Sequence, residues 1–334
     1  MQQDDSELGE FDVIRRYFSR LGAARSDVVL GVGDDAALVR APADAELAVA
    51  VDTLVAGRHF LDGCDARSVG HRALAINLSD LAAMGAAPAW ATLALTLPRA
   101  DAGWLERFSG GFADLANAHG VALIGGDTTA GPLTVSVQIT GFLARGTALR
   151  RSGAQAGDLL AVTGTLGDAG AGLALASGHC TAGDAVAARE LVGRYEFPTP
   201  RVEFGLGARG IATAAMDLSD GLAGDLPKLA GASGLKAEVD VERLPLSAAL
   251  QAVASLEQAQ HWALSAGDDY ELLLAVPPGR LDALASLAAR LNLKLSVIGR
   301  LMPGNSVNWS LHGRAVTPSP GYDHFRRAST QITV

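Results

Sequence analysis

The chain contains 334 residues and carries a formal net charge of −9, from 27 Lys and Arg against 36 Asp and Glu. This acidic balance argues against a nucleic-acid-binding protein, and a composition of 49% apolar and 19% charged residues favours a large buried core over disorder. Only three of the basic residues are lysines, Lys228, Lys236 and Lys294, and none follows a glycine, which excludes a P-loop.

The first half of the chain alternates β-type runs with helical patterns, beginning with an amphipathic helix over residues 11–21 that Gly22 can end. The expected strands are 47–51, 92–97, 121–124 and 133–143, and the expected helices between them are 68–84 and 101–119. A Gly- and Arg-rich connector over 145–158 marks a domain boundary. We therefore predict one domain over residues 1–148 and a second over residues 149–334.

The second half begins with a buried strand over residues 159–163, after which glycines at 164, 167, 170 and 172 mark a passage from strand to helix. Further strands are expected at 212–216, 235–239, 270–276 and 293–298, with helices between them. Both halves therefore combine strands with helices, and the sequence predicts an α+β or α/β protein with two mixed-sheet domains.

The longest uncharged stretch, Leu81–Pro98, approaches the length of a membrane-spanning helix. Gly85 and Pro88 interrupt it, so we interpret it as the end of a helix followed by a buried strand. The first ten residues are acidic and lack the apolar core of a signal peptide. Cys64 and Cys180 fit neither a disulfide nor a zinc pattern. The sequence thus predicts a cytoplasmic protein without a membrane partner.

Five acidic clusters stand at the ends of expected strands or in glycine turns. They are Gly33-Asp34-Asp35, Val51-Asp52-Thr53, Leu78-Ser79-Asp80, Gly125-Gly126-Asp127 and the run from Asp217 to Gly221. Each has an ordinary explanation: Gly-Asp-Asp is a common turn, and Ser219 or Asp220 could cap the following helix. Asp80 is harder to explain in this way, because it lies inside an apolar helical pattern, where an unpaired charge is costly.

Together, the five clusters are typical of a site for hard divalent cations. Carboxylates, waters and phosphate oxygens suit Mg²⁺, which usually takes one or two carboxylates from the protein. Five clusters therefore imply several ions shared with a polyphosphate. The sequence predicts a phosphoryl-transfer enzyme in which metal ions, rather than lysines, neutralise the phosphates.

The motifs, taken in order along nearly the whole chain, resemble those of the thiamine-monophosphate kinase family. They are the segments 31–38, 52–60, 77–85, 124–129, 151–153, 216–222, 265–272 and 321–325. The wider superfamily includes aminoimidazole ribonucleotide synthetase, formylglycinamidine ribonucleotide synthetase, selenophosphate synthetase and a hydrogenase-maturation protein. The resemblance implies an N-terminal α+β domain of the aminoimidazole ribonucleotide synthetase type, which binds ATP and metal and forms a homodimer, followed by a C-terminal α/β domain.

The resemblance also implies an activity, the ATP- and Mg²⁺-dependent phosphorylation of thiamine monophosphate to thiamine diphosphate, with release of ADP. It makes Asp52, Asp127 and Arg151 the residues that act on the transferred group. The implied Mg²⁺ ligands are Asp35, Asp52, Asp80, Asp127, Asp217 and Asp220, with backbone contacts from Ala50 and Val51. The implied ATP contacts are Gly125, Gly126, Arg151 and Ser219, and the implied acceptor contacts are His59, Asp268 and Tyr322.

Two positions depart from the family pattern. Ala50 and Val51 stand where the family often has hydroxyl residues, so only their backbone carbonyls remain as metal ligands. Asp268, followed by Asp269 and Tyr270, replaces the usual glutamate of the acceptor motif, which shortens the reach of that carboxylate.

The implied chemistry agrees with the abundance of acidic clusters. A phosphate monoester has a second pKa of about 6, so the acceptor is already a nucleophilic dianion at neutral pH and needs no strong base. Bridging Mg²⁺ ions remove its repulsion from ATP, and Arg151 can add a bidentate phosphate contact. His59 has an alternative interpretation as a surface residue, and Tyr322 as a terminal aromatic docked on the core. In the functional interpretation, an aromatic face suits the cationic thiazolium ring.

Three other functions remain open at this point. Another ATP-dependent synthetase of the same superfamily is one, although no cysteine precedes Cys64 and the segment 330–334 contains none. A two-metal phosphohydrolase would use the same carboxylates on water. A Mg-nucleotide-binding regulatory module would bind ATP without turnover.

Overall fold

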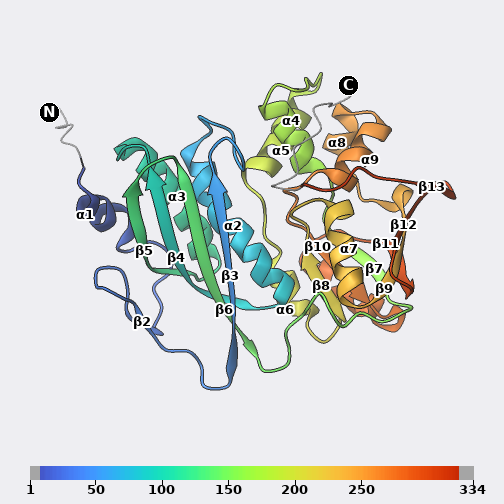
Figure 1. Cartoon of the computed structure of the whole chain (residues 1–334), viewed down its shortest axis with the longest axis horizontal. Coiled ribbons are helices and arrows are strands. Elements are labelled where there is room, and N and C mark those ends of the chain that lie inside the picture. Colours follow the sequence, from blue (N-terminus) through green and yellow to red (C-terminus); the bar gives the residue numbers. More distant parts are fainter. Residues whose placement is uncertain (1–7, 323–334) are drawn as a thin grey trace. The chain divides into compact units, whose positions relative to one another are not determined.

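A computed structural model describes residues 8–322, which form two compact units (Figure 1). Unit 1 contains the chain up to Leu149 together with Glu196–Gly210, and unit 2 contains Arg150–Tyr195 and the chain from Ile211 onward. The sequence pattern does not predict that residues 196–210 belong to unit 1. Residues 1–7, and the last part of the terminal motif at 323–325, lie outside the described residues.

Unit 1 is built on a four-stranded sheet with the strand order β3-β6-β4-β5. Strands β4 and β5 are parallel, whereas β6 runs antiparallel to both β3 and β4. Its strands are β1 Val28–Leu30, β2 Leu38–Val39, β3 Ala45–Val55, β4 Ala87–Leu97, β5 Ala122–Ala130 and β6 Thr134–Ala144, with β1 and β2 forming a separate pair. Its helices are α1 Glu10–Val13, α2 Ala66–Met84, α3 Ala102–Ala118 and α6 Val202–Ala208.

Helix α2 is the central helix of unit 1. It contacts β3, β6 and β4, and it packs closely against α3, because a Cβ atom at Gly70 would collide with the backbone of Phe108. Asp65 caps its N-terminus by accepting a hydrogen bond of 3.0 Å from the Arg67 N–H, and Gly85, at φ +66°, ends it. The expected helix end followed by a buried strand is thus confirmed, since only two residues separate the end of α2 from the start of β4.

The helix that we expected over residues 11–21 is shorter in the structure, and part of it is a π-helix rather than an α-helix. Helix α1 continues into a π-helical turn, Ile14–Phe18, and Gly22 lies beyond the helix, where it bridges to Ala122. In a π-helical turn, residues five apart lie on one face, which allows Val13 and Phe18 both to be buried while Phe11 remains exposed. No helix in the stretch from 8 to 322 is both long and apolar enough to cross a membrane.

Unit 2 is built on a seven-stranded sheet with the order β13-β12-β9-β11-β7-β10-β8, in which only β12 and β9 are a parallel pair. Its strands are β7 Leu159–Thr163, β8 Ala214–Asp217, β9 Leu235–Asp240, β10 Leu272–Val276, β11 Leu295–Pro303, β12 Val307–Leu311 and β13 Arg314–Val316. Its helices are α4 Asp168–Ala176, α5 Ala185–Glu196, α7 Leu222–Ala232, α8 Ala248–Val253, α9 Leu256–Ser265 and α10 Leu281–Arg290, with short 3₁₀ turns at Val241–Arg243 and Pro278–Arg280.

The topology of unit 2 brings three polar loops to one edge of the sheet. Strand β10 is antiparallel to both β7 and β8, so the carboxyl ends of β7 and β8 meet the amino end of β10. The loops there are 164–169, 217–221 and 266–271, which we call together the acidic edge. All of β10 is buried, so its hydrophobic run fixes where these loops lie.

Candidate functional site

Unit 1 brings two of the predicted metal ligands into contact. Asp52 projects from β3 and Asp80 from α2, and their carboxyl groups are within hydrogen-bonding range of each other. Burial raises the pKa of Asp52, while the hydrogen bond to Asp80 and the charge interaction with His59 lower it. Two carboxylates this close repel one another when both are ionised, so the pair has to share a proton or a cation.

His59 lies beside this pair with its tautomer fixed by the backbone. The Val55 N–H donates a hydrogen bond of 3.0 Å to Nδ1 of His59, so in the neutral ring the proton is carried by Nε2. His59 also interacts electrostatically with Asp52. The predicted acceptor-binding histidine is therefore placed with two predicted metal ligands, as a hydrogen-bond donor.

Other predicted residues of unit 1 lie elsewhere. Pairing across the sheet runs from Thr53 to Ser136, Ala94 and then Asp127, and the Thr53 and Ser136 hydroxyls are 2.8 Å apart on the open face. Asp127 therefore shares that open face, whereas Asp52, one position from Thr53, points to the face covered by α2. The structure brings Asp52 and Asp80 together but leaves Asp127 exposed on the opposite side of the sheet.

The neighbours of these residues also take definite places. Gly126, at φ +152°, follows Gly125 in β5 at a point where a side chain would collide with the Leu93 carbonyl of β4. Asp35 is exposed between β1 and β2. Ala50 and Val51 belong to β3, an edge strand in which every second carbonyl points out of the sheet, so a backbone metal contact from one of them is geometrically available.

In unit 2, Asp217 is the last residue of β8, and the loop that follows carries Ser219 and Asp220. Asp225 of α7, only 1% exposed, accepts hydrogen bonds of 3.0 Å from the backbone N–H groups of both Ser219 and Asp220 through Oδ2. Lys228 completes the arrangement, with Nζ 2.7 Å from Asp220 and 2.9 Å from Asp225. Burial raises the pKa of Asp225, and Lys228 opposes that shift. The loop is thus held by a buried carboxylate behind it.

The predicted acceptor residues of unit 2 are joined to the same loop. The Asp268 N–H donates a hydrogen bond of 2.9 Å to the Ser219 carbonyl, and the Tyr322 N–H donates one of 3.1 Å to the Asp220 carbonyl. Asp268 has φ +72° and Tyr270 φ +49°, conformations that non-glycine residues rarely adopt. Tyr270 therefore lies outside β10, which begins at Leu272 rather than at 270 as expected. The structure brings Ser219, Asp220, Asp268 and Tyr322 together.

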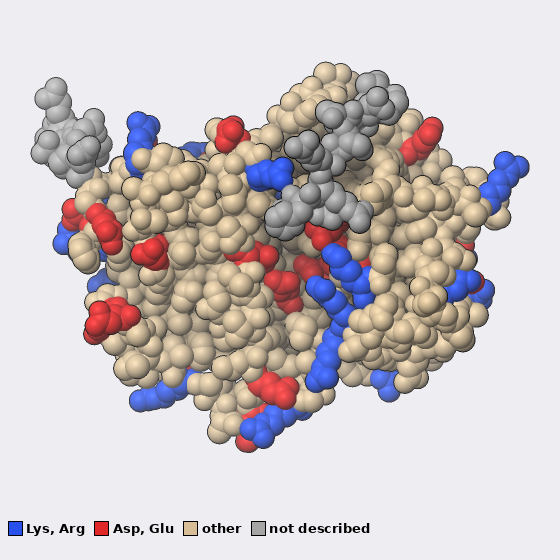
Figure 2. Space-filling view, viewed as in Figure 1, with Lys and Arg blue, Asp and Glu red and all other residues tan. Residues whose placement is uncertain are grey.

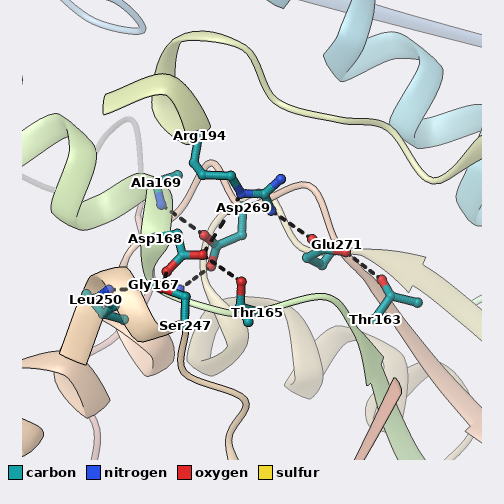
Figure 3. A network of polar contacts seen from close by, with 10 residues as sticks. All are labelled: Thr163, Thr165, Gly167, Asp168, Ala169, Arg194, Ser247, Leu250, Asp269 and Glu271. Atoms are coloured by element: carbon teal, nitrogen blue, oxygen red, sulfur yellow. Dashed lines mark hydrogen bonds and ion pairs between the residues drawn. The ribbon is translucent and has the colours of Figure 1, made fainter. Parts of the chain in front are cut away.

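A buried ionic network holds the acidic edge in this conformation (Figure 3). Asp269 accepts hydrogen bonds from the Gly167 N–H at 2.6 Å and the Ala169 N–H at 3.2 Å, at the start of α4. Glu271 accepts from Arg194 at 2.8 Å and from the Thr163 hydroxyl at 2.7 Å. Strained backbone persists only where surrounding contacts over-determine it, and this network supplies those contacts on both sides of Tyr270.

The network contains more acids than bases. Asp168, which accepts from the Thr165 and Ser247 hydroxyls at 2.6 Å each, adds a third carboxyl, and its Oδ2 lies 4.0 Å from the Arg194 Nε. Burial raises the pKa of Asp269 to about 8; the Gly167 N–H opposes this shift, the Asp168 charge adds to it, and Arg194 opposes it. Burial thus favours the protonated form of Asp269, whereas the backbone N–H groups and Arg194 favour the ionised form.

Sequence reasoning missed most of these supporting residues. The roles of Asp168, Arg194, Asp225 and Lys228 depend on contacts that their helices make with other segments of unit 2, although Asp225 gives the same signal as Asp80, an acid inside an apolar helix. Arg151 is exposed, and its carbonyl accepts a hydrogen bond of 3.2 Å from the Ser233 hydroxyl. Figure 2 shows that most of the face drawn is uncharged and that acidic and basic side chains gather next to one another on it.

The oxygen ligands that these residues offer fit Mg²⁺ better than they fit a metal ion that is bound by protein side chains alone. Within residues 8–322, no group of three or more His, Cys, Asp or Glu side chains could enclose an ion. Mg²⁺ does not need such a cage, because it keeps waters and takes one or two carboxylates together with substrate phosphates. The Asp52–Asp80 pair, with the buried Oδ1 of Asn77 one helical turn earlier and without a hydrogen-bond partner in the described chain, supplies such hard oxygen donors.

Comparison with known proteins gives the class of protein. Residues 33–143 match the model of the AIR synthase related protein N-terminal domain, and residues 155–310 match that of the C-terminal domain. The chain is 47% identical over 319 residues to the thiamine-monophosphate kinase of Salmonella typhimurium, which covers 95% of this chain and 98% of the relative.

Solved structures agree with this match. The crystal structure of thiamine-monophosphate kinase from Stenotrophomonas maltophilia has a TM-score of 0.82 at 47% identity, over 87% of this chain and 93% of that one. A ThiL protein complexed with AMPPCP and TMP has a TM-score of 0.75 at 33% identity, over 88% and 92% of the two chains. The protein is thus a two-domain protein of the AIR synthase related class. Within that class, the chain belongs to the thiamine-monophosphate kinase family.

The raised pKa of Asp269 predicts a pH dependence of stability. Between about pH 4, the unfolded value, and pH 8 the folded chain keeps a proton that the unfolded chain loses. Stability from this group is therefore complete below pH 4 and declines as the pH rises to 8. We expect the unfolding midpoint of the wild type to fall more between pH 6 and 9 than that of Asp269→Asn, measured by circular dichroism. Parallel curves for the two proteins would contradict the assigned pKa.

Proposed function

We propose that this protein transfers the γ-phosphoryl group of ATP to the phosphate of thiamine monophosphate, giving thiamine diphosphate and ADP. The contact of Asp52 and Asp80 beside His59 is the observation that carries the proposal, because it joins a cation-binding carboxylate pair to a phosphate-binding donor. The full-length similarity to thiamine-monophosphate kinases supports the substrates, as does the related structure that contains AMPPCP and TMP.

In this proposal, Asp52 and Asp80 would hold Mg²⁺, which would neutralise phosphate charge during the transfer. An oxygen of the acceptor phosphate attacks the γ-phosphorus, the bond to the β–γ bridging oxygen breaks, and ADP leaves. Nε2 of His59 donates a hydrogen bond to the acceptor phosphate, since its Nδ1 is already occupied by the Val55 N–H. No protein group has to remove a proton, because the acceptor is a dianion above pH of about 6.

Unit 2 contributes the acidic edge. We assign ATP contacts to Ser219 and Arg151, as well as to Gly125 and Gly126 of unit 1, and further Mg²⁺ ions to Asp217 and Asp220. We assign Asp35 and Asp127 to further Mg²⁺ ions rather than to the ion of the Asp52–Asp80 pair, because Asp127 lies on the opposite face of the sheet from that pair. Asp268 and Tyr322 bind the thiamine end of the acceptor, where a carboxylate and an aromatic ring favour a cationic thiazolium. The backbone bonds between 268, 219, 220 and 322 mean that the acceptor and nucleotide contacts of this unit form one connected structure.

We also propose a homodimer and a cytoplasmic location. The open face of β3 exposes three large apolar side chains, with Leu47 50%, Val49 62% and Val51 65% exposed, an arrangement typical of a surface that another chain covers. Both cysteines are unpaired thiols, which agrees with a reducing compartment.

An ADP-release assay with a panel of acceptors tests the activity and its dependence on the carboxylate pair. With ATP and Mg²⁺, we expect ADP formation with thiamine monophosphate but not with thiamine, aminoimidazole precursors or water. Replacing Asp80 by Asn should lower kcat about 100-fold or more, because it removes a ligand from an ion that stabilises the transition state by several kcal/mol. Asp44→Asn, an exposed acid before β3, is the control. Equal ADP release without acceptor would instead identify a phosphohydrolase.

The substitution His59→Ala tests the phosphate donor. We expect the KM for thiamine monophosphate to rise about tenfold, the value of one hydrogen bond to a charged group, with little change in the KM for ATP. Steady-state kinetics with each substrate varied in turn distinguishes the two. An unchanged KM for thiamine monophosphate would remove His59 from the acceptor site.

The exposed apolar side chains of β3 predict that a charged substitution on this face prevents formation of the homodimer. Val49→Lys should convert the dimer to a monomer, because it places an ammonium group in an apolar interface. Val186→Lys is the matched control, since Val186 is 67% exposed in α5, on unit 2. Light scattering after gel filtration gives the mass. A Val49→Lys protein with the wild-type dimer mass would show that this face is not the interface.

A further inference from the structure

Lys228, one of only three lysines in the chain, lies next to a proposed metal ligand. It lies in α7, half-exposed, and its ammonium group contacts two carboxylates, Oδ2 of Asp220 at 2.7 Å and Oδ1 of Asp225 at 2.9 Å. Asp220 is the proposed metal ligand at the start of this helix. A permanent cation therefore already occupies the carboxylate to which a metal ion is expected to bind.

Asp225 fixes the ammonium in this place. Its carboxylate is buried, and Oδ2 is fully used by the backbone N–H groups of Ser219 and Asp220, at 3.0 Å each. Oδ1 is therefore the atom that Lys228 contacts, and the same buried group anchors both the loop and the lysine. Since Lys228 follows Asp225 by three residues on one helix, the two side chains share a face and the contact needs no rearrangement.

The electrostatic consequence is competition between two cations for one carboxylate. An ammonium group in contact with Asp220 satisfies part of its negative charge and repels a divalent ion that approaches its other oxygen. A polyphosphate changes this balance, because it brings several negative charges to both cations at once.

We propose that Lys228 is an internal counter-cation of the 217–221 loop, which a divalent metal ion must displace from Asp220, so that metal binding at this loop is weak until a nucleotide is present. The inference rests on the proposed function, in which Asp220 is a metal ligand. In this chain, which lacks a P-loop lysine, Lys228 would weaken metal binding to Asp220 rather than bind the phosphates of the nucleotide.

Mn²⁺ binding to the full-length protein without nucleotide tests the proposal. The free ion is followed by its electron paramagnetic resonance signal, which does not depend on turnover. We expect Lys228→Met to bind Mn²⁺ about tenfold more tightly at its weakest site, because one repelling charge near the protein surface is gone. Lys228→Arg keeps the charge and should behave as the wild type. Lys236→Met is the matched control, since Lys236 pairs with Glu238 at 3.0 Å on β9, outside this loop.

Two results decide the outcome. Tighter binding in Lys228→Met that disappears in the double variant Lys228→Met, Asp220→Asn supports the proposal. Identical Mn²⁺ binding curves for the wild type, Lys228→Met and Lys236→Met overturn it. If Lys228→Met does not fold, Lys228→Gln serves as the second variant, with the unfolding midpoint as the check. Failure of the proposed function appears separately, as absence of ADP formation by the wild type with every acceptor.

Discussion

The contact between the carboxyl groups of Asp52 and Asp80 is the interaction on which the rest of this site depends. The register of β3 and the packing of α2 force the two acids together in a partly desolvated place, where two negative charges cannot remain without a proton or a cation. The acidic edge of unit 2 meets the same constraint with internal partners, namely Arg194 for Glu271, Lys228 for Asp220 and backbone N–H groups for Asp269. The Asp52–Asp80 pair of unit 1 meets it with a shared proton or a bound cation.

Much of this arrangement could be predicted from the sequence. Strand β7 has the bounds expected from its apolar run, and α2 ends within the uncharged stretch where Gly85 stands. The position of Asp80 in an apolar helix was a sound physical signal, because a buried acid has to have a partner. The order of the motifs along the chain also identified the family. The structure adds that Asp52, Asp80 and His59, which are separated in sequence, are close in the fold.

Other features lie beyond what a sequence can show, because they depend on strand register and on contacts between loops. Asp52 and Asp127 both follow the motif pattern, yet pairing through β6 and β4 places them on opposite faces of the sheet. No local signal predicts that residues 196–210 belong to unit 1. The positive φ angles of Asp268 and Tyr270 likewise result from the ionic network around Asp269 and Glu271, not from local propensity.

Cation binding by the Asp52–Asp80 pair is tested most directly by thermal unfolding of the nucleotide-free protein as Mg²⁺ is added. A ligand that binds only the folded state raises the unfolding midpoint, and replacing one of two repelling acids by a neutral amide removes the repulsion without the ion. We expect Mg²⁺ to raise the midpoint of the wild type clearly and that of Asp80→Asn little, with Asp80→Asn the more stable of the two in metal-free buffer. An equal response of both proteins to Mg²⁺ would contradict a metal site built on this pair.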